Sequence, residues 1–412
     1  MVQVPTRRFG RTELQLPIIS CGGTRYSYTL RKEAGDLRLR NDLTAADIPD
    51  EIHEGVSAII NRSLELGINH FETAHGYGSS EVQLGQALSA IPRDKFVLQT
   101  KVGPTAGESE FLTAFHKSLE RLQVDYLDLF TLHGINNAEQ FDWTFRKNGS
   151  LDWAYRLKDE GLCRHIGFST HGPTDRMCRV ISSDRLDYIF LHWYFVDNRN
   201  WPAIELANQH DMGVYIISPN DQGGRLYRPS PKLEELCKPL TPMAFNLLWC
   251  LSRPQVHSLA LGPDRPENFD AHVETISTYY NTEEGEELTE SIATRLKNEV
   301  NSVMGEDWYD TFHIGIPDYD EIPGEMNLIH ILRVWGFAKA LDMYEFAKWK
   351  YNMLGNGSHW FPGNNAARIG ELDILNEIKD NPFADTLPSI LAEAHENLIG
   401  EPVKRLTQGG RD

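Results

Sequence analysis

Short apolar runs alternate with amphipathic segments over the first 280 residues of the chain. The clearest amphipathic segment has apolar residues at helical spacing and ends before Gly67, which predicts a helix over 51–66. Further helices are predicted at about 80–90, 109–122, 150–160, 174–183, 202–210, 242–251 and 266–279. The apolar runs predict strands at 18–21, 69–73, 96–101, 126–132, 165–169, 188–193, 214–218 and 257–261.

This alternation predicts an α/β fold. Strand-then-helix units repeated eight times over roughly 260 residues fit a parallel (β/α)8 barrel, the TIM barrel. A doubly wound sheet usually has fewer units, and no Gly-x-Gly-x-x-Gly run follows the first strand. We therefore predict a barrel over residues 1–280.

The pattern changes after residue 280. Helical segments are predicted at about 281–301, 326–354 and 366–400, with a turn-forming cluster at 356–365. No strand-like run interrupts them. Residues 281–412 are therefore predicted to form an added all-α C-terminal extension.

Composition narrows the class of protein. With 40 basic and 59 acidic residues the net charge is −19, which argues against nucleic acid and anionic membranes as partners. Five cysteines without CxxC spacing argue against a disulfide framework or a cysteine metal site. The N-terminus has no apolar signal segment, and no apolar run is long enough to span a membrane. We expect a cytoplasmic soluble protein.

Four polar side chains follow adjacent predicted strands at the end where barrel enzymes place their catalytic groups. These are Glu72 and Tyr77 after the second strand, Lys101 on the third and His133 on the fourth. A phenol is a poor acid at neutral pH unless a nearby cation stabilises its anion, and Lys101 can supply that cation. Glu72 can keep Lys101 charged, and His133 can donate to a carbonyl oxygen. Together they predict a proton-delivery and oxyanion-binding site.

These motifs resemble the aldo-keto reductase superfamily over about residues 6–280. The matching segments are Gly67–Ala74 with Tyr77-Gly78, Ser80-Glu81 and Leu84-Gly85; Thr100-Lys101; Ser118–Leu122 with Asp125–Leu129; His133; Gly167–Ser169; and Ser218-Pro219. The resemblance implies a metal-free barrel that reduces aldehydes and ketones with NAD(P)H, with Tyr77 as general acid. Glu72 stands where the family has an aspartate. The negative charge is kept, but the side chain that pairs with Lys101 is one methylene group longer.

The resemblance also implies cofactor contacts. Ser169 and Thr170 match the carboxamide-binding pair, although the family has Asn at position 170, and the family glutamine aligns with Phe190 or His192. The nicotinamide-stacking position holds Ile217, and the pyrophosphate loop contributes Ser218, Gly223, Gly224 and Leu226. The adenosine segment contributes Arg265, Glu267 and Asn268. A guanidinium at position 265 suits a 2′-phosphate, which favours NADP over NAD, while Asp264 beside it weakens that preference.

The extension resembles that of a reductase subgroup in which cysteine motifs hold iron–sulfur clusters. Residues 281–412 contain no cysteine, so we predict no cluster here. Trp360 begins a segment near the position where a cluster-binding run is expected. We interpret the extension as a structural cap packed on the barrel.

Three hypotheses follow. The first is an NADP-dependent reductase of a small carbonyl compound, such as a sugar or another polar aldehyde or ketone. The second is a cofactor-binding redox sensor with little turnover, which Glu72 and the cysteine-free extension motivate. The third is a lyase or epimerase that recycles bound cofactor. The polar stretch at 24–50 and the aromatic residues Trp143, Trp153, Trp193 and Tyr194 are candidate substrate contacts. The sequence does not determine the oligomeric state, and a homo-oligomer is one of the possible states.

Overall fold

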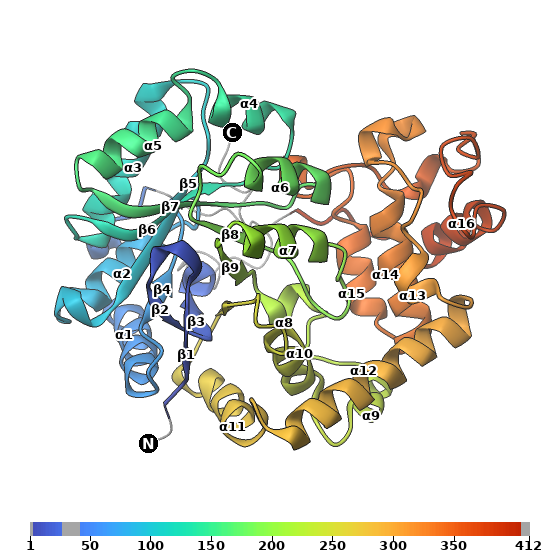
Figure 1. Cartoon of the computed structure of the whole chain (residues 1–412), viewed down its shortest axis with the longest axis horizontal. Helices are drawn as coiled ribbons and strands as arrows, with labels where there is room; N and C mark the ends of the chain where they lie inside the picture. The colour runs from blue at the N-terminus through green and yellow to red at the C-terminus, as the bar shows by residue number, and fades with distance from the viewer. Residues whose placement is uncertain (1–2, 27–41, 405–412) are drawn as a thin grey trace.

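A computed structural model describes residues 3–26 and 42–404 of the chain. Within them, parallel strands close into a barrel in the order β10-β3-β4-β5-β6-β7-β8-β9 (Figure 1). The strands are β3 (Ile19–Gly22), β4 (His70–Glu72), β5 (Val97–Val102), β6 (Leu127–His133), β7 (Cys163–Ser169), β8 (Tyr188–Leu191), β9 (Gly213–Ile216) and β10 (Ser258–Leu261). The predicted (β/α)8 barrel is confirmed.

Helices surround the barrel because the amphipathic segments turn their apolar faces onto the strands. They are α1 (Asp50–Glu65), α2 (Ser80–Leu88), α3 (Glu108–Leu122), α4 (Ala138–Phe145), α5 (Ser150–Asp159), α6 (Thr174–Ile181), α7 (Trp201–Gln209), α8 (Pro219–Gln222), α9 (Pro231–Cys237), α10 (Pro242–Leu251) and α11 (Asp270–Tyr279). Helices α4, α8 and α9 were not predicted. Helices α8 and α9 span less than two helical turns, which is too short to show a helical period, and α4 is a separate helix in the segment before α5.

A hairpin of β1 (Thr6–Arg8) and β2 (Gln15–Pro17) precedes the barrel. Its turn packs Phe9 against Tyr188 and His257, at ring-centroid distances of 5.5 and 5.8 Å. Gly10 has φ +52° and lies so close to the backbone of Gly213 that a Cβ atom would be 2.4 Å from its nitrogen. The hairpin therefore seals the end of the barrel opposite the candidate site.

The C-terminal extension contains α12 (Glu283–Met304), α13 (Trp308–Thr311), α14 (Leu328–Leu341), α15 (Tyr344–Tyr351) and α16 (Leu387–Leu398). Figure 1 shows α13, α14, α15 and α16, in orange and red, to the right of the barrel, and α12, in gold, along the lower edge of the view. The predicted helix over 326–354 is two helices, because Asp342 adopts a left-handed conformation with φ 55° and ends α14. Much of the predicted helix over 366–400 is turns before α16.

One hydrophobic core runs through both parts of the chain. It joins barrel residues such as Phe195 to extension residues such as Tyr309, whose hydroxyl also donates to the Phe195 carbonyl at 2.7 Å. The division at residue 280 stays a prediction. Most of the predicted polar stretch at 24–50 lies outside the described residues. Among the described residues, no helix is both long and apolar enough to cross a membrane.

Candidate active site

Lys101 and Glu72 form a buried ion pair at the centre of the barrel. Strands β4 and β5 are parallel neighbours, so their side chains meet at one end of the barrel. The Lys101 ammonium is 0% exposed and contacts the Glu72 carboxylate, which is 3% exposed. It also donates to the Thr73 carbonyl at 2.8 Å. Burial alone lowers the pKa of Lys101, but the charge of Glu72 and the interactions with Glu72 and the Tyr77 hydroxyl outweigh it and raise the pKa.

Tyr77 lies between this ion pair and His133. The Lys101 nitrogen is 5.0 Å from the centroid of the Tyr77 ring, and the His133 ring meets Tyr77 edge-on at 5.7 Å. The loop that carries Tyr77 is held by Ser80, whose hydroxyl contacts Thr73 at 2.8 Å and donates to the Gly23 carbonyl at 2.7 Å. The structure therefore brings together all four residues that the sequence singled out for chemistry.

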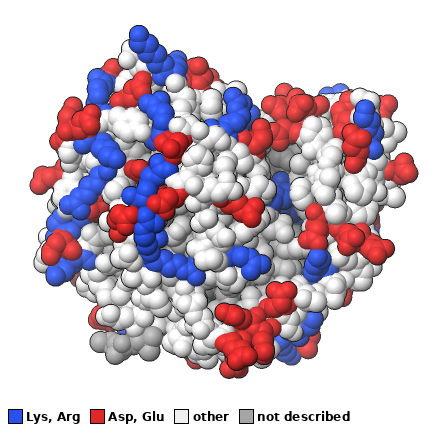
Figure 2. All heavy atoms as spheres, viewed as in Figure 1, with Lys and Arg blue, Asp and Glu red and all other residues white. Residues whose placement is uncertain are grey.

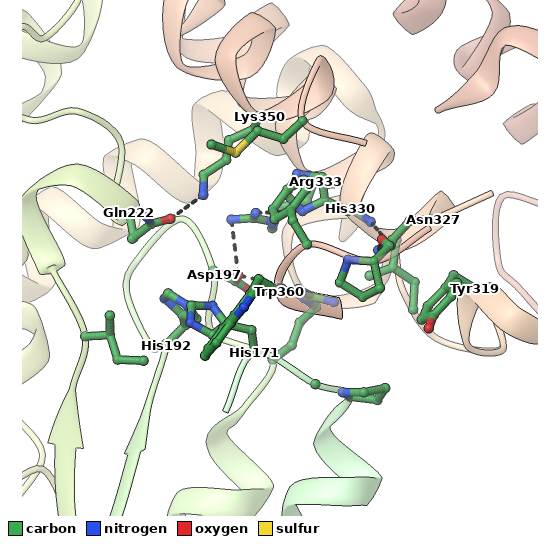
Figure 3. Close-up of a pocket in the computed structure, with 18 of the residues that line it drawn as sticks. His171, His192, Asp197, Gln222, Tyr319, Asn327, His330, Arg333, Lys350 and Trp360 are labelled. Atoms are coloured by element: carbon green, nitrogen blue, oxygen red, sulfur yellow. Dashed lines mark hydrogen bonds and ion pairs between the residues drawn. The ribbon is translucent and has the colours of Figure 1, made fainter. Parts of the chain in front are cut away.

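A cavity of about 210 Å³ opens above Tyr77 and His133. Its floor comes from the barrel and includes Thr24, Ser169, Phe190, Ile217 and Ser218. The extension forms its roof with His330, Arg333, Trp349, Lys350, Trp360 and Phe361. Figure 3 shows the labelled roof side chains facing Gln222, Asp197, His192 and His171, which belong to the barrel side. The volume suits a small molecule, since an engineered cavity of about 150 Å³ binds benzene.

Trp360 brings the extension into direct contact with the reacting centre. Its ring lies 4.6 Å from that of His133 and 5.5 Å from that of His171. The neighbouring His359 is hydrogen-bonded to Asn136, in the loop after β6, at 3.1 Å. Gly134, with φ +83°, makes room for the indole, because a Cβ atom there would lie 2.4 Å from it. The extension is therefore part of the candidate site.

A pair of histidines lines the same cavity. His192 and His171 are hydrogen-bonded through ring nitrogens at 2.6 Å, and the other His192 nitrogen contacts the Tyr194 hydroxyl at 2.6 Å. Tyr194 in turn donates to the Ile217 carbonyl. This chain of contacts fixes the cavity wall after β7 and β8.

The predicted cofactor residues fall into two groups. Ser169, Ile217 and Ser218 line the cavity with Tyr77 and His133. The Ser169 hydroxyl accepts from the Gly134 amide at 3.1 Å. Gly223, Gly224 and Leu226 are buried in the loop after β9 and do not line the cavity. A Cβ atom on Gly223 would meet the Pro219 carbonyl at 2.1 Å, so only glycine allows this tight turn.

The remaining predicted cofactor residues are Thr170, Arg265, Glu267 and Asn268. The Thr170 hydroxyl donates to the Ile135 carbonyl at 2.9 Å and accepts from the Gly172 amide, so backbone groups occupy it. Arg265 and Glu267 are exposed, and the Asn268 side chain accepts from the Arg265 amide at 3.2 Å. Hydroxyl donors on the cavity floor and a tight glycine turn beside it fit a phosphate-containing cofactor. The individual roles stay predictions.

Sequence reasoning did not place Trp360, Arg333, His330 and Lys350 at the candidate site. One signal was available for two of them. Arg333 and His330 interrupt the apolar first part of α14, and a charged residue in such a position indicates a paired or functional group. No sequence motif near that helix indicates that it packs at the mouth of the barrel. The ion pair of Arg333 with Asp197 therefore became visible only in the structure.

Comparisons with known proteins agree with this geometry. The model of the aldo/keto reductase family matches residues 53–293. The uncharacterized oxidoreductase YqkF of Bacillus subtilis is 24% identical over 264 residues, covering 55% of this chain and 84% of that protein. The L-galactose dehydrogenase of Arabidopsis thaliana is 29% identical over 202 residues, covering 44% of this chain and 62% of that protein.

Solved structures share the fold. An aldo-keto reductase from Klebsiella pneumoniae, in complex with NADPH, has a TM-score of 0.53 and 22% identity, and the match covers 71% of this chain and 96% of that chain. Because the family model covers more than half of the chain, the protein belongs to the aldo-keto reductase family.

Proposed function

We propose that the protein reduces an aldehyde or ketone to the alcohol with NADPH, and that Tyr77 donates the proton. The observation that carries this proposal is the position of the Tyr77 ring between a buried ammonium and an imidazole. The family is one of oxidoreductases, and a structural neighbour is known in complex with NADPH. A relative named L-galactose dehydrogenase supports a sugar-like or other polar substrate.

The residues divide the chemical work. His133 donates to the carbonyl oxygen and polarises it, while Tyr77 transfers its proton to the same oxygen as negative charge develops there. The Lys101 ammonium stabilises the phenolate that remains, and Glu72 keeps that fully buried ammonium charged. The bound nicotinamide cofactor supplies the hydride. Ser169, Ile217 and Ser218 would hold its nicotinamide end, and Arg265 is proposed to contact the 2′-phosphate.

The test compares Tyr77→Phe with the control Tyr126→Phe. Tyr126 directly precedes β6, at the end of that strand opposite His133. We expect Tyr77→Phe to lower kcat by at least about 100-fold, the usual contribution of a general acid. Its affinity for NADPH, measured by quenching of tryptophan fluorescence, should stay that of the wild type.

Three outcomes would contradict the proposal. Retention of most activity in Tyr77→Phe would exclude the phenol as proton donor. Tight cofactor binding with no turnover across a broad carbonyl panel would favour the redox-sensor hypothesis. Product formation without net NADPH consumption would favour the lyase or epimerase hypothesis.

A further inference from the structure

Several charged side chains line the cavity, some from the barrel and some from the extension. Among the described lining residues, Arg199, Arg333 and Lys350 are cations, and Asp197 and Asp318 are carboxyls. Arg333 is 5% exposed and pairs with Asp197 at 3.2 Å, and Arg199 pairs with the same carboxylate at 3.0 Å. One carboxylate thus faces two guanidinium groups. Figure 2 shows the molecular surface hollowed between the barrel and the extension, with a basic side chain visible inside the hollow.

Two buried donors in this cluster have no acceptor within residues 3–26 and 42–404. Arg333 donates to the Val196 carbonyl at 3.2 Å and to the His330 Nδ1 at 3.0 Å, but its Nε has no partner. Arginine only donates, so the His330 Nδ1 must accept and its proton lies on Nε2. That Nε2 is also buried without a partner. Burial and the charge of Arg333 hold the pKa of His330 well below its ordinary value, so the ring stays neutral.

Unpaired donors of this kind indicate a missing acceptor. A buried N–H without a partner is costly, and proteins rarely leave two in one cluster. Anionic oxygens are the strongest acceptors for such groups, and a guanidinium matches a carboxylate or a phosphate in shape. Both residues line the cavity whose floor holds Tyr77 and His133.

We propose that His330, Arg333 and Arg199 form an anion-binding subsite, and that the substrate is a small carbonyl compound bearing a carboxylate or phosphate. This inference rests on the proposed function. The barrel then supplies the reacting groups, and the extension supplies the groups that select the substrate. Trp360 lines the same cavity and contacts His133.

The test compares charged and neutral substrates of similar shape. The pairs are 4-oxobutanoate with butanal, and glyceraldehyde 3-phosphate with glyceraldehyde. We expect kcat/KM of the wild type to favour one charged substrate over its neutral partner by at least tenfold. His330→Phe, which removes the unpaired donor, and Arg333→Lys, which keeps the charge opposite Asp197, should each lower that ratio at least fivefold.

The matched control is Lys339→Met. Lys339 lies on the same helix as His330 and Arg333, but it pairs with Glu393 at 2.8 Å and does not line the cavity. Its charged-to-neutral ratio should equal that of the wild type. A wild-type ratio near one, or equal ratios in His330→Phe and Lys339→Met, would overturn the subsite. The subsite would also be overturned if the variants weakened NADPH binding and left the ratio unchanged, because the anion would then belong to the cofactor.

A binding measurement separates this inference from the proposed function. Succinate and inorganic phosphate are titrated by calorimetry, with and without NADP, against the wild type, His330→Phe and Lys339→Met. Binding that His330→Phe weakens and Lys339→Met retains would support the subsite even if no aldehyde is reduced. Reduction of neutral aldehydes without such binding would keep the proposed function and refute the subsite.

Discussion

Removing the charge of Glu72 should lower the free energy of unfolding, because it leaves the buried Lys101 ammonium without its counter-ion. Glu72→Leu leaves the Lys101 ammonium buried, with the Thr73 carbonyl and the Tyr77 hydroxyl as remaining partners. At an effective dielectric constant of about 20, two unit charges about 2.8 Å apart attract by about 6 kcal/mol. Partial relaxation reduces the observed loss, so we expect about 3–5 kcal/mol of lost unfolding free energy.

A double-mutant cycle tests the magnitude. Lys101→Met alone strands the Glu72 carboxylate and should cost a similar amount, whereas Glu72→Leu with Lys101→Met replaces the pair with apolar groups. The double variant should therefore be at least about 3 kcal/mol more stable than the sum of the single effects predicts. Urea unfolding followed by tryptophan fluorescence measures all four proteins. One core joins barrel and extension, so a single transition is expected.

The pH dependence of stability is a second test of the coupling between Glu72 and Lys101. Without Glu72, burial dominates and lowers the folded-state pKa of Lys101 below its unfolded value. The unfolded state then binds more protons, so the stability of Glu72→Leu should rise with pH and approach that of the wild type in alkaline solution. Glu120→Gln, which breaks the exposed pair with Lys117, is the control and should cost less than about 1 kcal/mol. Additive effects in the cycle, or a pH-independent loss, would refute the account of a coupled buried pair.

Three further predictions concern the cavity and the cofactor segment. Gly134→Ala should push Trp360 off His133 and lower the unfolding free energy by about 1–3 kcal/mol, which urea unfolding measures; unchanged stability and unchanged KM would contradict that contact. Burial and neighbouring carboxylates raise the pKa of Asp318 to about 6, so the folded state binds more protons and stability falls as pH rises from about 4 to 6. Asp318→Asn should therefore raise Tm at pH 7.5 and lose that advantage near pH 4; an equal shift at both pH values would be evidence against it. Arg265→Ala should weaken NADPH binding about tenfold in a fluorescence titration and leave NADH binding unchanged, since only NADPH carries the 2′-phosphate; equal effects on both cofactors would exclude a role in selecting between them.

Barrel geometry explains which parts of the candidate site were predictable. Strands β4, β5 and β6 are successive in the sequence and adjacent in the sheet, so residues at their ends meet at one rim. That rule alone brings Glu72, Lys101 and His133 together. Tyr77 lies at the same rim because it is in the short loop after β4. Hydrogen bonds of Ser80 to Thr73 and Gly23 hold that loop in place.

The extension could not be placed by the same reasoning. Helical periodicity predicted its helices, but it gives no direction in which a helix packs against a distant barrel. The contact of Trp360 with His133 depends on the space left by Gly134 and on the hydrogen bond from Asn136 to His359. These are contacts between distant segments, and no sequence period encodes them.

The late position of Trp360 in the chain has a consequence for synthesis. About 100 residues separate the last barrel strand, which ends at Leu261, from Trp360, and ribosomes add roughly 5–20 residues per second. The barrel strands are therefore all made for roughly 5–20 s before the roof of the cavity exists. During that interval the nascent protein presents an open barrel mouth and an uncovered apolar face. Completion of the cavity is thus tied to completion of translation, and a chain terminated before Trp360 would carry Tyr77, Lys101 and His133 without the extension residues that line the cavity.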